Sequence, residues 1–311
     1  MEKPLARESG IVRVIASSPE EERAALRHFS KLLREQPASS FERAKTPNEL
    51  ATVDGLLQHI PEFVTAYGAL PVTGVSAANF HFVDTARLPD EERDRIAQAN
   101  IGGLYDFRNQ SAAIVPDDRS LLVTAHRVLH ELLHFESFVA LQATPDAAAA
   151  TGATSVPRRI GFSVFNKAHT RRFFRDFDEA MIEMLAARFD DKYFTGIPTL
   201  TSELDRRKAI RGLVARASED IAAVVSRQGQ SGQWETVIEE WRYKAERERL
   251  QRFIDEVYTA NTEEFASKED VLALLARAVF TGKLLDVARI TEKTFGPGSF
   301  RELGQETMLA E

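Results

Sequence analysis

The segment from Leu121 to Leu141, LLVTAHRVLHELLHFESFVAL, contains neither Gly nor Pro and is the centre of the predicted fold. Its apolar residues recur at helical spacing over most of the helix surface, which predicts a largely buried α-helix. They are Leu122, Ala125, Leu129, Leu132, Leu133, Phe135 and Val139. Asp117, Asp118 and Ser120 are candidate N-caps for this helix. Pro145 and the turn-rich run after it limit the far end.

Within this helix, residues 130–134 read HELLH and match the pattern HExxH. Two helical residues four apart lie about 40° apart around the axis and about one turn apart along it, so His130 and His134 can reach one small cation. Two neutral nitrogens suit Zn²⁺, and the carboxylate of Glu131 suits a general base acting on a metal-bound water. The pattern therefore predicts metal-assisted hydrolysis, with Zn²⁺ as the cofactor.

A chance match is one alternative to this interpretation. With 7 His and 47 acidic residues among 311, a shuffled chain would contain about 0.02 matches to His-acid-x-x-His. A second alternative is a core helix with incidental histidines, but each buried histidine would then need a polar partner. His126 precedes His130 by one turn and lies about 12 Å along the axis from His134. We therefore interpret His126 as a supporting or surface group, not as a third ligand.

A hydrolytic zinc site needs a third protein ligand, and a second helix offers one. Residues 174–189 read FRDFDEAMIEMLAARF and combine an apolar helical face with Glu179 and Glu183, one turn apart. A carboxylate from this helix would complete a site with two histidines and one glutamate, and the second carboxylate would orient a ligating histidine. The alternative is that both glutamates belong to a solvated helix face. His169 is the only later histidine and lies in a polar segment.

HELLH followed by DEAMIEMLA resembles the gluzincins, the thermolysin-like zinc metallopeptidases with HExxH on one helix and ExxxD on another. The metzincin continuation fails, because Ser137 and Ala140 occupy its Gly and His positions. The resemblance implies that His130, His134 and Glu179 are zinc ligands and that Glu131 is the catalytic base. Glu183 falls where the family often has Asp.

The resemblance also implies an α+β, zincin-like fold of the minimal bacterial kind. Such a fold has a small, mostly antiparallel sheet, an active-site helix and a mainly helical C-terminal subdomain that forms the far wall of the cleft. That wall often supplies a side chain that stabilises the oxyanion, for which Tyr243 and then Tyr258 are candidates here. Ordinary packing is the alternative role for both tyrosines.

The residues before the HELLH segment indicate the expected small sheet. Residues 79–84, NFHFVD, alternate like a strand, and residues 102–107 and 112–115 indicate two strands joined around Arg108. In gluzincin-like peptidases an edge strand lies over the cleft, and the stretch GGLY…AAIV resembles that element. Because an edge strand has unpaired backbone groups, it can hold an extended peptide, so we expect a peptide or protein substrate.

Composition excludes several other functions. The net charge of −7 and the pI of about 5.7 argue against nucleic-acid binding. The short basic runs 158–159 and 171–172 are interpreted as solvated surface. No Cys is present, which excludes disulfides and thiolate ligands. The N-terminus has no apolar signal region and no run is long enough to span a membrane, so we expect a cytoplasmic protein without a membrane partner. Nothing in the sequence specifies an oligomeric state.

Three regions are expected along the chain. Residues 1–70 are predicted to be helical, chiefly at 19–35 and 47–67, with Ser17 or Ser18 at the first helix start. Residues 71–195 form the catalytic core, with a long loop at 144–165 that includes a short strand at 160–165. Residues 196–311 form a helical subdomain with no strands. Its expected helical segments are 202–227, 234–259, 267–281 and 286–295.

Two other functions remain open on the sequence alone. One is a non-catalytic or self-inhibited zinc-binding regulatory protein on the same scaffold. The other is a di-iron carboxylate protein, because Glu131-x-x-His134 also fits the Glu-x-x-His element of those sites. A di-iron site needs a second Glu-x-x-His, which this chain lacks.

Overall fold

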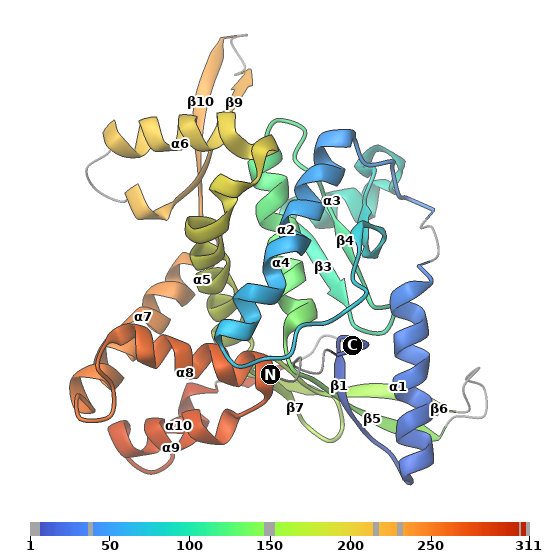
Figure 1. Cartoon of the computed structure of the whole chain (residues 1–311), viewed down its shortest axis with the longest axis vertical. Helices are drawn as coiled ribbons and strands as arrows, with labels where there is room; N and C mark the ends of the chain where they lie inside the picture. Colours follow the sequence, from blue (N-terminus) through green and yellow to red (C-terminus); the bar gives the residue numbers. More distant parts are fainter. Residues whose placement is uncertain are drawn as a thin grey trace, which may run out of the picture.

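The computed structural model describes residues 7–36, 40–145, 153–213, 218–228, 233–304 and 306–308. Over these ranges the chain is an α+β protein with ten α-helices and small sheets of six, three and two strands. None of the helices in these ranges is long and apolar enough to cross a membrane. Figure 1 shows three helices side by side in the middle of the molecule, with sheets and further helices around them.

The three-stranded sheet confirms the strands expected before the HELLH segment. Its order is β2 (Phe80–Phe82), β4 (Ser111–Ile114) and β3 (Gly103–Asp106). Strand β4 pairs in parallel with β2 and antiparallel with β3, so the sheet is mixed, whereas a mostly antiparallel sheet was expected. The outer edge of β3 has no partner strand in this sheet.

The six-stranded sheet changes two expectations. Its order is β1 (Ile11–Ile15), β5 (Val139–Pro145), β6 (Ala153–Ile160), β7 (Ser163–Phe165), β8 (Arg171–Phe173) and β11 (Glu306–Met308). Only the β1–β5 pair is parallel. Residues 1–70 contain the two predicted helices, but they also contain the strand β1, which was not expected. The loop predicted at 144–165 is largely a set of hairpins, apart from residues 146–152, which lie outside the described ranges.

The central helices are α2 (Pro47–Ala66), α4 (Leu121–Glu136) and α5 (Arg175–Tyr193), which pack on one another (Figure 1). Helix α4 is shorter than predicted, because the chain turns extended at Ser137 and residues 139–145 pair with two strands as β5. Helix α1 (Pro19–Arg34) begins after the expected N-cap Ser18 and packs on β1. A separate helix α3 (Asp90–Gln98) precedes β3.

The C-terminal third holds α6 (Thr201–Leu213), α7 (Lys244–Ala260), α8 (Lys268–Thr281), α9 (Leu284–Phe295) and α10 (Ser299–Leu303). The helices expected at 267–281 and 286–295 are confirmed. The prediction of no strands is wrong, because β9 (Ile221–Gln228) and β10 (Trp234–Glu240) form a hairpin that projects beside α6 (Figure 1). Cross-strand pairing and burial of the apolar run 221–225 favour a strand there.

Five short 3-10 turns connect these elements at Ala77–Asn79, Thr85–Arg87, Phe194–Gly196, Pro198–Leu200 and Ser218–Asp220. The main core extends from Leu33 to Ile290 and takes residues from α2, α4, α5, α7 and α8. A second, smaller core lies between α1 and the six-stranded sheet, around Phe29, Val139 and Leu141. Helix α4 is thus enclosed by apolar contacts, which hold its backbone in a fixed position.

Candidate metal centre

The N-terminus of α4 is held by two acceptors. Ser120 is the N-cap, and its side chain accepts a hydrogen bond from the backbone N–H of Val123 at 3.1 Å. The carboxylate of Glu203, from α6, accepts from the backbone N–H of Leu121 at 2.9 Å and contacts the Ser120 hydroxyl. A negative charge at this end is favourable because the first N–H groups of a helix are unpaired and its dipole is positive there.

The C-terminus of α4 is held by a cation from the start of the described chain. The Arg7 guanidinium donates to the backbone carbonyls of Glu136 at 2.7 Å and Ser137 at 3.3 Å. It also pairs with the Glu136 carboxylate at 2.9 Å. Both ends of α4 therefore carry a charge of the sign that its dipole favours, and the helix that bears HELLH is fixed at both ends.

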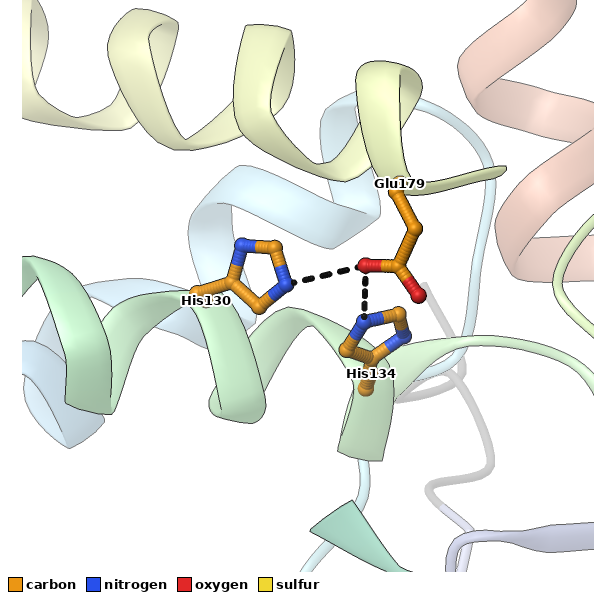
Figure 2. Close-up of side chains that lie close together, drawn as sticks. All are labelled: His130, His134 and Glu179. Atoms are coloured by element: carbon orange, nitrogen blue, oxygen red, sulfur yellow. Dashed lines mark hydrogen bonds and ion pairs between the residues drawn. The ribbon is translucent and has the colours of Figure 1, made fainter. Parts of the chain in front are cut away.

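His130, His134 and Glu179 come together between α4 and α5. Figure 2 shows both imidazoles directed at the Glu179 carboxylate. The Oε2 atom of Glu179 lies 3.3 Å from Nε2 of His130 and 3.6 Å from Nε2 of His134. One ligand atom from each residue lies within 4.8 Å of the other two. The arrangement brings together the three residues that the sequence indicated as ligands.

These separations fit a small tetrahedral cation. Zinc binds imidazole nitrogen and carboxylate oxygen at about 2.0–2.2 Å, which places two ligands of a tetrahedron about 3.3–3.6 Å apart. The two separations from Glu179 fall in this interval. A set of two imidazoles and one carboxylate is also a donor set that Zn²⁺ prefers and that leaves a fourth position for water or substrate.

Electrostatics also favour a cation between these side chains. Burial opposes ionisation of Glu179, but hydrogen bonds with His130 and His134 hold its pKa well below the usual range. Burial likewise opposes a charge on His130, but Glu179 and Glu183 raise its pKa well above the usual value. The carboxylates thus create a negative potential at the point where the two imidazoles meet.

Glu183 makes the contact expected of an orienting carboxylate. Its Oε2 atom lies 3.0 Å from Nδ1 of His130, and its Oε1 atom accepts a hydrogen bond from the backbone N–H of Arg242 at 2.7 Å. With Nδ1 engaged, Nε2 of His130 is the nitrogen directed at Glu179. Such a partner fixes the orientation of a ligating imidazole.

Glu131 is enclosed between α4 and the edge strand β3. The residue is only 6% exposed, and burial raises its pKa. A Cβ atom placed on Gly103 would lie 2.7 Å from Oε1 of Glu131 and 2.8 Å from its Cγ atom. Gly103 is thus needed for close approach of the strand to this side chain. The Gly102-Gly103 pair in the sequence was a signal of this close approach, but it was not interpreted in that way.

The segment Trp241–Arg242–Tyr243 passes along the metal centre. Tyr243 has a positive φ of 54°, and its ring stacks on His130 with centroids 6.0 Å apart. A non-glycine residue in this conformation is uncommon and is found more often at functional sites. Burial raises the pKa of Tyr243, which keeps its hydroxyl protonated. Tyr258, the second candidate, packs against the main core instead.

His126 supports the site without belonging to the ligand cluster. Its Nε2 atom lies 2.9 Å from a carboxylate oxygen of Asp190, and its ring lies 4.4 Å from the ring of Trp241. Asp190 also binds the guanidinium of Arg207, at 2.7 Å through its second oxygen. The expectation that His126 is not a ligand agrees with this geometry. His169 lies in the turn after β7 and is stacked on Phe165, away from the cluster.

Arg172 was predicted to be solvated surface, which is wrong because it contacts two carboxylates, and Asp178 was not singled out in the sequence. Arg172, on β8, places Nη2 3.6 Å from Oε1 of Glu179 and 3.6 Å from Oδ2 of Asp178. The buried Asp178 accepts hydrogen bonds from Phe162 N and the Ser163 hydroxyl, both at 2.8 Å, and so joins α5 to β7. The acidic pair before MIEM was visible in the sequence, but only tertiary packing brings Arg172 to it.

Comparisons with family models, curated proteins and solved structures find no match to this chain. A functional interpretation therefore depends on the geometry of the site.

Proposed function

We propose that the protein is a zinc-dependent metallopeptidase of gluzincin type on a zincin-like scaffold. The observation that carries the proposal is the convergence of His130, His134 and Glu179, whose ligand atoms lie within 4.8 Å of one another. A Glu at the second HExxH position, enclosed beside an unpaired strand edge, supports hydrolysis over mere metal storage.

In this proposal, His130, His134 and Glu179 hold the ion. Bound zinc supplies a water of lowered pKa and polarises the substrate carbonyl. Glu131 accepts a proton from the attacking water and returns it to the leaving nitrogen. The outer edge of β3 pairs with the extended peptide, because its backbone groups have no strand partner in the sheet. Tyr243, whose ring stacks on His130, would donate a hydrogen bond to the developing oxyanion.

The first experiment measures metal binding and hydrolysis separately. Protein purified without a metal-affinity column is dialysed against zinc, and bound zinc is counted by mass spectrometry. We expect about one zinc per chain, and chelator-sensitive cleavage of a mixed peptide pool. A zinc content far below one per chain after dialysis would refute the metal site and the function with it.

A closed, non-catalytic zinc protein is the second candidate. The limited exposure of the site favours it, because the side chains of His130, His134 and Glu179 are only 10–13% exposed. Stoichiometric zinc without cleavage of any peptide in the pool would support this candidate. A di-iron protein is disfavoured, because the described residues offer one cluster of three metal-binding side chains and no second set.

A further inference from the structure

Basic residues are concentrated, without acidic ones, in one segment of the chain next to the metal centre. The net charge is −7, yet no acidic residue occurs from Ala147 to Arg175. The same stretch contains Arg158, Arg159, Lys167, Arg171, Arg172 and Arg175. Its described part forms the hairpins β6–β7–β8, so the two basic runs that seemed separate in the sequence lie on strands of one sheet.

Four side chains of these hairpins form what we call the basic row: Arg158, Phe165, His169 and Arg172. The row begins at the metal centre, where Arg172 Nη2 lies 3.6 Å from Glu179 Oε1. Phe165 and Arg172 are directly paired across β7 and β8, and the guanidinium lies 5.8 Å from the ring centroid. The His169 ring stacks on Phe165 with centroids 5.7 Å apart and an interplanar angle of 24°.

Arg158 extends the row without a carboxylate partner among the described residues. Its Nε donates to the Gln142 side-chain oxygen at 2.7 Å, its Nη2 donates to the same oxygen, and its Nη1 donates to the Asn166 carbonyl at 3.1 Å. Both acceptors are neutral. Arg159 is likewise held by neutral acceptors, because its guanidinium donates to the carbonyls of Gly161, Ala278 and Gly282. A positive charge held only by neutral acceptors remains available to an anionic ligand.

The β3–β4 turn adds a further positive charge to this region. Burial lowers the pKa of His169, and the charges of Arg158 and Arg108 lower it further. Arg108 is exposed and follows β3 in the chain. The Nε2 atom of His169 is buried and has no hydrogen-bond partner in the described part of the structure. The row therefore runs from Arg172 at the metal centre to Arg158 on β6.

We propose that the basic row binds carboxylate groups of a peptide and so selects acidic substrates. This inference rests on the proposed peptidase function for its substrate, but not for the binding itself. Three of the five N–H donors of Arg158 are used by Gln142 and Asn166, which leaves one on Nη1 and one on Nη2 for a carboxylate. A long polyanion such as nucleic acid fits less well, because the row is short and the rest of the chain is acidic. The carboxylate can come from Asp or Glu side chains or from the peptide C-terminus.

Peptide binding to full-length Glu131→Gln protein, supplemented with zinc, separates these sources. The probes are fluorescein-labelled hexaglutamate amide, hexaalanine with a free C-terminus and hexaalanine amide, followed by fluorescence anisotropy. Binding of hexaglutamate amide supports side-chain recognition, and binding of free hexaalanine but not its amide supports recognition of the C-terminus. Binding of neither acidic probe overturns the inference.

Matched arginine variants show whether the row is the site. Arg158→Gln should weaken binding about fivefold, the loss expected for one partly exposed ion pair. Arg13→Gln makes the same charge change on the edge strand β1, which β5 separates from β6, and should leave Kd unchanged. Equal weakening by both variants would mean non-specific attraction and would overturn the inference. If Arg158→Gln does not fold, Arg108→Gln, which changes an exposed side chain, should weaken binding in the same direction.

Cleavage profiling distinguishes failure of this inference from failure of the proposed function. If the wild-type protein cleaves the mixed pool without preference for Asp, Glu or chain ends, the peptidase proposal stands and the inference fails. If nothing is cleaved but hexaglutamate binding still depends on Arg158, the carboxylate site stands and the peptidase proposal fails.

Discussion

At the scale of single residues, the side chains proposed to bind the metal differ from the side chain proposed to act as the base. His130, His134 and Glu179 supply the ligand atoms, whereas Glu131 lies beside them and is absent from the cluster. Replacing Glu131 by Gln keeps its size and removes its basicity. We therefore expect Glu131→Gln to retain about one zinc per chain and to lose peptide hydrolysis by about 10²–10⁴-fold.

The control for this variant is Glu91→Gln, which makes the same change on the exposed helix α3 and should leave both measurements unchanged. Zinc content by mass spectrometry and initial cleavage rates provide the two readings. Full activity in Glu131→Gln would show that the assigned base is wrong.

A substitution at Gly103 tests how much room the Glu131 side chain has. An added methyl group would lie 2.7 Å from Glu131 Oε1 and 3.0 Å from its Cδ atom, so the carboxylate or the strand has to shift. Because displacement of a reacting group by about 1 Å can lower a rate about 100-fold, we expect Gly103→Ala to lose about 10- to 100-fold in kcat with zinc retained.

Gly212→Ala is the matched control for Gly103→Ala, because a Cβ there meets no atom within 4 Å. It lies in α6, where Ala is the better helix former, so activity should stay unchanged and stability should not fall. Unchanged kcat in Gly103→Ala would show that Glu131 has more room than the structure indicates.

At the scale of elements, helix α4 depends on partners remote in sequence. Glu203 accepts a hydrogen bond from Leu121 N at 2.9 Å and contacts Ser120 at the helix start. Glu203→Ala leaves the N-cap Ser120 in place but removes the acceptor of Leu121 N and a charge that the dipole favours, and should destabilise the fold by about 1–2 kcal/mol. Urea unfolding followed by circular dichroism measures the loss.

Asp205→Ala, an exposed acid on the same helix, is the control for Glu203→Ala and should change stability by less than about 0.5 kcal/mol. Equal effects of the two variants would mean that a general loss of negative charge, and not capping of α4, explains the result.

Local signals explain which elements could be predicted from the sequence. Helices α1 and α2 carry caps at Ser18 and Thr46, and α4 and α5 carry long apolar faces. The β3–β4 hairpin is also local, and so are the HELLH and DEAMIE patterns. Some missed elements, such as β1, are defined by partners distant in sequence, whereas the hairpins β6–β7 and β9–β10 were missed although their partners are close in the chain. Ile11 pairs with Val139 across most of the N-terminal half of the chain, and no pattern within five residues reveals such a partner.

The same distinction between short sequence patterns and distant partners applies to the candidate site. His130, Glu131, His134, Glu179 and Glu183 occur in two short patterns whose helical spacing already implies a shared face. Gly103, Arg172 and Arg242 reach the site from three other segments. Their contacts arise only when the sheets and the β9–β10 hairpin pack around α4 and α5.

At the scale of the whole molecule, one buried ion network joins the C-terminal hairpin to the central helices. Asp190 on α5 contacts His126 on α4 and Arg207 on α6, and Arg207 also donates to the Ala222 carbonyl of β9 at 2.9 Å. The network holds the base of the hairpin, after which the chain passes along the metal centre as residues 241–243. Loss of the network should therefore loosen the site as well as the fold.

This network should make stability sensitive to acid in a defined pH range. Burial opposes ionisation of Asp190, but its bonds to Arg207 and His126 lower its pKa to about 2, from 3.8 in the unfolded chain. A carboxyl with a lowered folded-state pKa stabilises the protein fully above the unfolded-state pKa, and this contribution disappears as the pH falls toward the folded-state pKa. The contribution is about 2 kcal/mol at pH 6, and roughly half of it is lost by pH 3.

Asp190→Asn isolates this contribution. At pH 6 the variant should be less stable than the wild type by about 3 kcal/mol, because Arg207 remains buried without its anionic partner. The difference in unfolding free energy should narrow as the pH falls from 4 to 3, since the wild type then begins to protonate Asp190 on unfolding while the variant has no such proton to bind. Urea titrations at pH 6, 4 and 3 measure this difference in unfolding free energy. Asp205→Asn, at an exposed position, is the control. A difference that stays constant over this range would show that Asp190 is not held ionised by Arg207 and His126.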